Sequence, residues 1–132
     1  MSGFRDLNVY IEARNLVVKI YTLLKKFPDD ERFAMCSQLR RSSVSITSNI
    51  AEGISRTSNK DQIHFINIAF GSLMEVLSQI DVACVLGYIT NDEFLEIEQS
   101  IKTISKMLSG LRSSIERRNP SLSTFNIQHS TI

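Results

Sequence analysis

The chain has 132 residues, of which 42% are hydrophobic and 22% are charged, so it is long enough for one domain with its own core. Glycine and proline are scarce, at 5 and 2 residues, which favours long helices over a turn-rich β fold. The net charge of +1, from 15 basic and 14 acidic residues, argues against a dedicated nucleic-acid-binding domain. There is no signal-peptide pattern and no run of about 18 apolar residues, so we expect a cytoplasmic protein that does not enter a membrane.

The first two predicted helices cover residues 7–27 and 30–52. Apolar residues of the first recur at spacings of three and four, which places them on one helical face. This stripe comprises Val9, Ala13, Leu16, Ile20, Leu23 and Phe27. A proline follows and disfavours helix at the residue before it, so it should end this segment. Asp29 or Asp30 is expected to cap the second helix and Gly53 to stop it.

Two longer helices are predicted over residues 59–86 and 91–117. Ser58 or Asn59 is expected to cap the third helix, and Gly87 to end it. Thr90 with a glutamate three residues later forms a capping box for the fourth. The apolar stripe of the third helix comprises Ile63, Ile66, Phe70, Leu73, Leu77, Ile80 and Cys84. That of the fourth comprises Phe94, Ile97, Ile101, Ile104, Leu108, Leu111 and Ile115.

Four such segments joined by short connections should pack with neighbours antiparallel. The predicted fold is all-α, an antiparallel up-down-up-down four-helix bundle over residues 1–118. Residues 119–132 read as a C-terminal tail with no stable fold of its own. Cys36 and Cys84 lie within helical patterns, so we expect buried free thiols and no disulfide.

A polar stripe on the second helix is the strongest candidate site. Its side chains share a face about 100° from the apolar stripe of the same helix. The candidate site comprises Gln38, Ser45, Asn49 and Glu52 on the second helix and Ser72 and Glu75 on the third. Two interpretations are open: a hydrogen-bond network that fixes the register of the bundle or its oligomer, and a site for a ligand or partner.

Four basic residues on the second helix and just after it are candidates for phosphate contacts: Arg40, Arg41, Arg56 and Lys60. The planar fork of arginine suits phosphate oxygens. The alternative is ion pairing or plain solvation, because acidic residues such as Glu52 lie close in sequence.

The first helix carries more apolar surface than one bundle seam requires. The additional residues are Tyr10, Val17, Val18, Tyr21 and Leu24. Exposed apolar patches of this extent usually mark an interface, so the sequence predicts a contact between subunits here. A wider core within one subunit is the alternative.

The residues give little support to catalysis. Asp61 and His64 lie one turn apart, but a di-iron bundle needs two Glu-x-x-His pairs and further glutamates. We find no Gly-rich phosphate loop, no zinc-type cysteine spacing and no nucleophile elbow. We therefore expect a protein that is not an enzyme and that has no catalytic residues, metal site or cofactor.

Several ordered segments together resemble one family, the small bacterial four-helix-bundle proteins encoded in intervening sequences of 23S ribosomal RNA genes. The resemblance covers roughly residues 4–115. It is carried by Phe27-Pro28 with Glu31, Gln38 to Arg41, Ser45-Ile46 with Ser48 to Gly53, Ala69 to Leu73 with Glu75, and Leu86 to Tyr88. Many members have proline where this chain has Thr47, so its second helix is expected to be less kinked.

The resemblance implies a homo-oligomer, commonly a pentamer, and an association with RNA or the ribosome, without an established catalytic activity. The predicted function is therefore a non-catalytic oligomeric four-helix-bundle scaffold that associates with RNA, with the ribosome or with a nucleic-acid-bound protein. The alternative is a protein–protein interaction adaptor without nucleic-acid contact. The net charge of +1 argues mildly for this alternative unless oligomerisation gathers the basic side chains.

Overall fold

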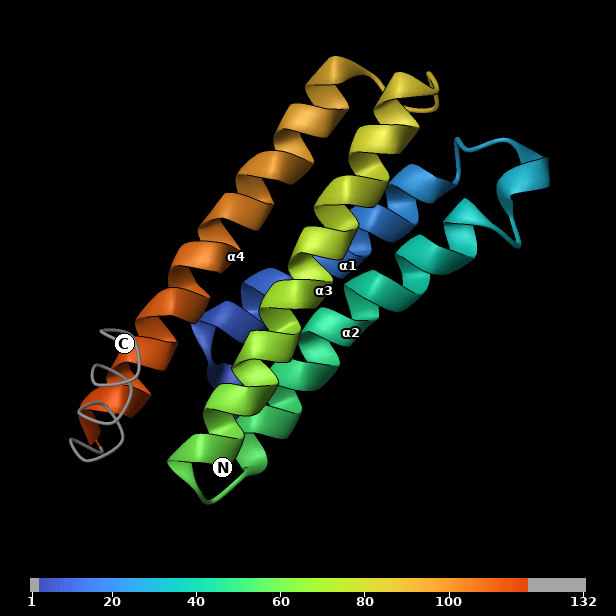
Figure 1. Ribbon diagram of the computed structural model, residues 1–132. Helices are drawn as coiled ribbons and strands as arrows, with labels where there is room; N and C mark the ends of the chain where they lie inside the picture. Colours follow the sequence, from blue (N-terminus) through green and yellow to red (C-terminus); the bar gives the residue numbers. More distant parts are fainter. Residues whose placement is uncertain (1–2, 119–132) are drawn as a thin grey trace, which may run out of the picture.

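The computed structural model describes residues 3–118 of the chain (Figure 1). Its α-helices are α1 (Asn8–Leu24), α2 (Met35–Ser55), α3 (Asn59–Val85) and α4 (Asn91–Arg118), and its 3-10 helices are η1 (Phe4–Asp6) and η2 (Asp29–Glu31). Successive α-helices lie side by side and run in opposite directions along the chain (Figure 1). The predicted all-α four-helix bundle is confirmed. The predicted tail, residues 119–132, lies outside the described residues.

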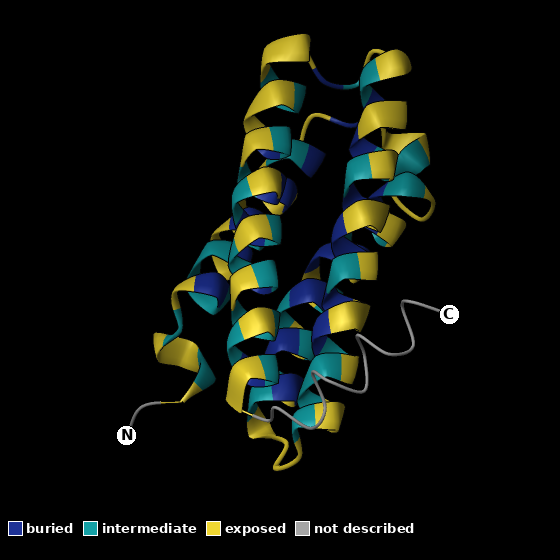
Figure 2. Ribbon diagram, turned by 60° about the vertical axis from the view of Figure 1, so that its left-hand side comes forward, coloured by how far each residue is buried: buried dark blue, intermediate teal, exposed yellow. Residues whose placement is uncertain are grey.

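The core lies along the axis of the bundle, and each α-helix turns its buried residues toward it (Figure 2). The largest side chains that are fully buried are Leu16, Ile20, Leu39, Ile46, Ile50, Ile66, Leu73, Ile80, Ile101, Ile104, Leu108 and Ile115. For α1 and α4 these residues belong to the predicted stripes, and on α2 Leu39, Ile46 and Ile50 likewise recur at spacings that keep side chains on one face of a helix.

The buried face of α3 is rotated from the predicted one. Ala69, Val76 and Ala83 are fully buried, whereas Phe70 and Cys84, which belong to the predicted stripe, are only half-buried. α3 packs most extensively against α2. Small side chains at a helix–helix contact allow the two axes to approach closely, which explains why alanines occupy this face.

Side-chain caps define the ends of α3 and α4 as the sequence predicts. Ser58 Oγ accepts a hydrogen bond from the Asp61 amide at 3.1 Å. Thr90 Oγ1 accepts from the Glu93 amide at 3.1 Å, and Glu93 Oε1 accepts from the Thr90 amide at 2.8 Å, which completes the capping box. Gly87 follows α3 with a φ of 83°, a conformation that favours glycine and ends the helix.

The start of α2 differs from the prediction. The helix begins at Met35 and not near Asp30, because Ala34 has a φ of −115° and a ψ of −101°, which no helix accommodates. The aspartates form η2 and do not cap α2. Phe33, between η2 and α2, is 85% exposed. α2 then continues without interruption through Thr47, where a proline is common in the family it resembles.

Gly53 lies inside α2 and does not stop it, because the helix continues to Ser55. A Cβ at this position would lie 3.1 Å from Phe65 Cβ and 3.3 Å from the Gln62 carbonyl oxygen. Glycine therefore serves here to let α2 and α3 approach each other closely just before the turn that joins them.

α3 is the one helix among the described residues that is long and apolar enough to cross a membrane by length and composition. Its 18-residue window has a mean hydropathy of 1.5, and 33% of that window is buried. A core helix of a bundle passes the same test, and α3 packs against both α2 and α4. This single feature is weak evidence for a membrane span.

Candidate functional site

A series of hydrogen bonds connects α2 to α3 along one side of their contact. We name it the polar seam, and it consists of Ser42, Ser45 and Asn49 on α2 and Ser72, Glu75 and Gln79 on α3. The hydroxyl oxygens of Ser45 and Ser72 are 2.8 Å apart. Asn49 Nδ2 donates to Ser45 Oγ at 3.0 Å and to the Ser45 carbonyl at 2.8 Å.

The second half of the polar seam is centred on Gln79. Ser42 Oγ donates to Gln79 Oε1 at 2.7 Å, and Gln79 Nε2 donates to Glu75 Oε2 at 3.3 Å. Ser42 is 2% exposed and Ser72 is 8% exposed. Hydroxyl groups so deeply buried are costly without partners, and these bonds supply them. Such contacts can occur only in one register of α2 against α3.

Four of the six residues of the predicted polar site belong to the polar seam: Ser45, Asn49, Ser72 and Glu75. Glu52 instead pairs with Arg56 on its own helix, with an Oε2–Nη2 distance of 2.7 Å. Gln38 is exposed near the start of α2. Sequence analysis missed Ser42 and Gln79 as members of the site. Ser42 has the spacing of the polar stripe, but a pattern within one helix does not reveal a partner on another.

The thiols and the histidine of the bundle show no catalytic arrangement. Cys36 is 4% exposed, and burial raises the pKa of its thiol, which keeps it protonated at neutral pH. Cys84 is half-buried, less than predicted, and its Sγ donates to Asn91 Oδ1 at 3.2 Å. His64 is exposed on α3. Within residues 3–118, no three His, Cys, Asp or Glu side chains are placed to hold a metal ion.

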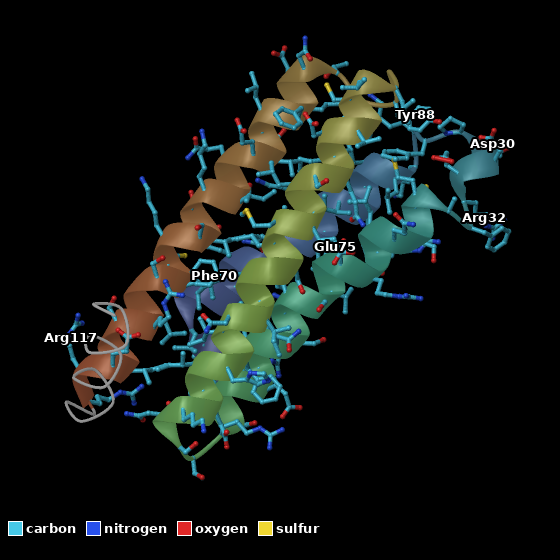
Figure 3. The ribbon with its side chains drawn as sticks, in the orientation of Figure 1. Asp30, Arg32, Phe70, Glu75, Tyr88 and Arg117 are labelled. Atoms are coloured by element: carbon cyan, nitrogen blue, oxygen red, sulfur yellow. The ribbon has the colours of Figure 1, made fainter. Side chains whose placement is uncertain are left out.

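Basic side chains gather where the turn between α2 and α3 meets the end of α4 (Figure 3, around Arg117). We name this the basic end, and it comprises Arg56, Lys60, Arg112, Arg117 and Arg118. The two segments are joined by a hydrogen bond from Asn59 Nδ2 to the Ile115 carbonyl at 3.1 Å. Glu52, Asp61 and Glu116 are the acidic residues nearest to these positions in sequence.

Two guanidinium groups of the basic end lie over aromatic rings of α3. Arg112 stacks over Phe70 at 4.9 Å from the ring centroid, and its Nη1 donates to Asn67 Oδ1 at 3.0 Å. Arg56 stacks over Phe65, also at 4.9 Å. Stacking and the bond to a neutral amide hold Arg112 in place, which lowers the entropy that it would lose on binding an anion, whereas Arg56 is already paired with Glu52.

The opposite end of the bundle is acidic. It comprises Asp29, Asp30 and Glu31 in η2 and Asp92, Glu93 and Glu96 at the start of α4. The rings of Phe27 and Tyr88, 5.4 Å apart, join the two segments. Burial raises the pKa of Tyr88, and the charges of Glu31 and Asp30 raise it further. Lys25, Lys26 and Arg32 lie at this end as well, and Arg32 is labelled beside Asp30 in Figure 3, so acidic side chains predominate here without standing alone.

The structure does not bring the four predicted phosphate contacts together. Arg56 and Lys60 belong to the basic end, but Arg40 and Arg41 lie about 15 residues earlier on α2, which corresponds to about 22 Å. Arg40 Nη2 donates to the carbonyl of Arg32 at 3.1 Å. The other arginines of the basic end come from α4, more than 50 residues along the chain from Arg56, which is why sequence analysis did not group them.

Three of the five residues predicted for an oligomer interface line a groove between α1 and α2. Val17, Val18 and Tyr21 form its apolar wall together with Val44, around a volume of about 360 Å³. Val18 is 61% exposed, Tyr21 42% and Val44 38%. We name this the α1–α2 groove. Val44 was not part of the prediction, because it lies on the polar-rich second helix.

The other two predicted interface residues have partners within the subunit. Leu24 is only 8% exposed and belongs to the subunit's own core. Tyr10 is half-buried, and its ring lies 4.9 Å from that of Phe4. The extra apolar surface of α1 thus serves partly the core and partly the α1–α2 groove.

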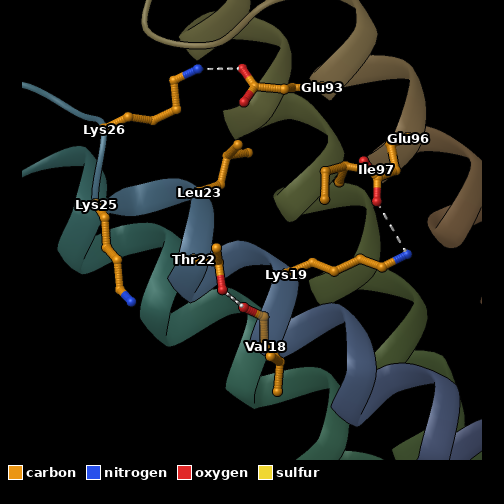
Figure 4. A pocket seen from close by; sticks show the side chains of 9 residues that line it. All are labelled: Val18, Lys19, Thr22, Leu23, Lys25, Lys26, Glu93, Glu96 and Ile97. Carbon is orange, nitrogen blue, oxygen red and sulfur yellow. Dashed lines mark hydrogen bonds and ion pairs between the residues drawn. The ribbon is translucent and has the colours of Figure 1, made fainter.

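A second groove separates α1 from α4 near the acidic end and has a volume of about 480 Å³ (Figure 4). Leu23 and Ile97 are among its apolar residues. Lys26 Nζ bonds to Glu93 Oε1 at 2.7 Å across one end. The lysine lowers the pKa of Glu93, and the backbone amide of Thr90 lowers it further. Glu93 thus takes part both in the capping box of α4 and in an ion pair between α1 and α4.

Replacing Glu93 by glutamine should therefore lower the melting temperature at neutral pH. A carboxyl whose pKa is lowered by folding stabilises the fold above its unfolded pKa, and this stabilisation disappears as pH falls through the folded pKa. The melting temperatures of Glu93→Gln and the wild type should thus converge in acid. Glu96→Gln is the control, because Glu96 is 66% exposed and its Oε1 lies 3.8 Å from Lys19 Nζ. A constant difference at all pH values would contradict this assignment.

Comparison with known proteins places this bundle in a family. The family model described as 23S rRNA-intervening sequence protein matches residues 5–110, which include α1 to α3 and most of α4. A crystal structure of a protein of unknown function from the S23 ribosomal protein family of Bacteroides thetaiotaomicron is similar, with a TM-score of 0.73 and 28% identity, over 79% of this chain and 97% of that chain. A search of curated proteins found no match. The chain belongs to the 23S rRNA-intervening sequence protein family.

Proposed function

We propose that this protein is a non-catalytic, self-associating scaffold of the cytoplasm that binds RNA through its basic end. The observation that carries the proposal is the group of five basic side chains at the basic end. A net charge of +1 would not by itself attract a polyanion, but Arg56, Lys60, Arg112, Arg117 and Arg118 lie together at one end. Phosphate contacts from clustered arginine and lysine supply most of the affinity of non-specific RNA binding.

The family supports ribosomal RNA as the first RNA to test. Its description refers to a 23S rRNA intervening sequence, and the similar crystal structure comes from a family named for a ribosomal protein. Neither description states what this chain binds. The stacked guanidinium group of Arg112 adds a physical argument, because a preorganised arginine suits phosphate oxygens.

Self-association is the second part of the proposal, and a pentamer is the favoured state. The α1–α2 groove exposes Val18, Tyr21 and Val44 next to one another, an arrangement that a second copy can cover. Copies arranged in a ring with parallel bundles would gather their basic ends on one side and so raise the local positive potential. Association and RNA binding would then reinforce each other.

Binding of a labelled 23S rRNA fragment as a function of salt concentration tests the RNA proposal. Affinity should fall as salt rises, and the double variant Arg117→Ala/Arg118→Ala should weaken binding and reduce the slope of log K against log salt by about 2. The matched control, Arg40→Ala/Arg41→Ala, removes the same charge away from the basic end and should retain the wild-type slope. Equal losses in the two variants, or no binding at low salt, would reject the basic end as the site.

Light scattering tests the self-association proposal. The wild type should be an oligomer at micromolar concentration, and Val18→Asp should dissociate it, because a carboxylate buried in an apolar contact is costly. Leu95→Asp is the control, since Leu95 is 55% exposed on α4, away from the α1–α2 groove. A monomeric wild type, or dissociation by both variants alike, would overturn this interface.

The alternative function is a protein-interaction adaptor without nucleic-acid contact. The nearly balanced charge of the whole chain favours it, because most nucleic-acid-binding domains are strongly basic. The same salt titration separates the two functions. An adaptor would leave the labelled RNA free at low salt, whereas it would still retain its protein partner after nuclease treatment.

A further inference from the structure

The second half of α4 carries positive charge well beyond the basic end. Residues 99–118 contain five basic residues and a single acidic one, Glu116, whereas residues 91–98 contain four acidic residues and no basic one. The helix dipole favours cations only in the last turn of a helix. Lys102 and Lys106 lie 16 and 12 residues before Arg118, the end of α4, so the dipole does not account for them.

Part of this charge forms one row on the exposed side of α4. At 100° per residue, Lys102, Lys106 and Arg117 fall within a sector of about 60°, and the row is about 22 Å long. All three side chains are exposed, and we name them the basic row. Lys102 Nζ lies 3.8 Å from Glu98 Oε1. Within residues 3–118, the other four basic residues of this half of α4 form no ion pair, so their charge is available to an anion.

A groove between α3 and α4 runs beside the start of the basic row. It has a volume of about 260 Å³, and Lys102 and Lys106 line it. Its apolar residues are Met74, Leu77 and Ile101, and Met74 is 46% exposed. An apolar surface gains nothing from a phosphate backbone, but it can cover the face of an unpaired nucleobase. The groove, which we name the α3–α4 groove, thus combines two cations for phosphates with a surface for a base.

Arg112 provides a second surface for a base on the same side of the bundle. Phe70, which faces α4, covers one face of its guanidinium group at 4.9 Å from the ring centroid (Figure 3). The bond to Asn67 Oδ1 fixes the plane of this group. Arg112 is only half-buried, and unpaired bases stack on planar guanidinium groups. The face of Arg112 that is turned away from Phe70 can therefore hold a base.

Two glycines lower the surface between these two positions. Gly71 follows Asn67 by about one turn on α3, and Gly110 follows Lys106 by about one turn on α4. Both are exposed, and a Cβ at either would meet no other group within 4 Å. Glycine in a helix interior is less stable than alanine, and packing within residues 3–118 does not require it here. It does allow the backbone of a ligand to approach both helices closely.

We infer that single-stranded RNA follows this side of the bundle from the basic end to the α3–α4 groove, an inference that rests on the proposed RNA binding. Its phosphates contact Lys102, Lys106 and Arg117. One base stacks on Arg112, and another enters the groove. A duplex keeps the faces of its bases within its own stack, so it cannot use these two contacts. Asp81 lines the next groove along α3 and repels phosphates, which sets the end of the path.

Salt titrations with a labelled oligouridine, which stays single-stranded, test the path. Lys102→Ala/Lys106→Ala should weaken binding and reduce the slope of log K against log salt by about 1 to 2, because two phosphate contacts are lost. The control Arg40→Ala/Arg41→Ala removes the same charge from α2 and should keep the wild-type slope. Light scattering should show the same assembly state for both variants, so that a change of avidity does not enter the comparison.

Arg112→Lys tests the stacking of a base, because lysine keeps the charge and removes the planar group. Affinity for oligouridine should fall by a factor of at least about 5 at an unchanged salt slope, which is the lower end for one stacked base. Circular dichroism should show an unchanged bundle. An RNA duplex of the same length should compete less well than unlabelled oligouridine for the wild-type protein.

The outcomes separate this path from the proposed function. If Arg117→Ala/Arg118→Ala weakens binding and Lys102→Ala/Lys106→Ala does not, RNA binds at the basic end and the path is wrong. Equal competition by the duplex, or wild-type affinity in Arg112→Lys, would overturn the assignment to a single strand. Absence of binding by the wild type at low salt would reject RNA binding itself, and the path with it.

Discussion

Replacing Leu73 by alanine should lower the free energy of unfolding by about 3 to 5 kcal/mol, which is the range for deleting a fully buried leucine side chain. Leu73 is 0% exposed near the middle of α3, the helix that packs against both α2 and α4. Because the surrounding residues come from several helices, the bundle cannot collapse around the cavity without moving more than one of them. Urea denaturation followed by far-UV circular dichroism measures the loss.

Leu95→Ala is the matched control for this experiment. Leu95 is 55% exposed on α4, so the same truncation should change the free energy of unfolding by no more than about 0.5 kcal/mol. Both variants should be measured at one protein concentration, since self-association makes apparent stability depend on concentration. Similar losses in the two variants would show that α3 is not at the centre of the core.

The second large effect is expected from Gly53→Val. A Cβ at Gly53 already lies 3.1 Å from Phe65 Cβ, and the two methyl groups of valine have even less space, so α2 and α3 must separate. Overpacking of this kind costs about 1 to 3 kcal/mol. The polar seam depends on the same helix–helix distance, so the bond between Ser45 and Ser72 should weaken as well. Thermal unfolding and amide hydrogen exchange in α2 and α3 measure the two effects.

Gly110→Val separates this packing effect from the helix propensity of valine. Gly110 lies within α4, where a Cβ would meet no neighbouring group within 4 Å, and valine is slightly better than glycine in a helix interior. This variant should therefore be as stable as the wild type or slightly more stable. A loss of the same size at both positions would mean that the close approach at Gly53 does not limit the packing.

The architecture could be predicted from sequence because its determinants are local. Ser58, Thr90 and Gly87 define helix ends through bonds to residues at most five positions away, and the apolar spacing identifies the buried faces of three helices. The start of α2 was missed, since the backbone conformation of Ala34 has no side-chain signature. The buried face of α3 was predicted wrongly because two apolar stripes overlap on this helix. The stripe that contains Ala69 is the buried one, because its small side chains allow the tight contact with α2.

The candidate sites were less predictable because they join distant segments. Gln79 completes the polar seam from another helix, and no pattern within α2 indicates it. Arg117 joins Lys60 at the basic end only after four helices have assembled, whereas Arg40 appears close to Arg56 only if the length of α2 is ignored. Leu24 was expected at the surface, but an apolar residue beside the main stripe of a helix can still belong to the core.

The short turn between α2 and α3 has a kinetic consequence. Only residues 56–58 separate these two helices, so bringing them together costs little chain entropy. α1 and α4 make contacts between residues far apart in the chain, as the bond from Lys26 to Glu93, 67 residues apart, illustrates. Assembly can therefore begin with a hairpin of α2 and α3 that forms first near the turn, at the basic end. The contact between α1 and α4 then forms late.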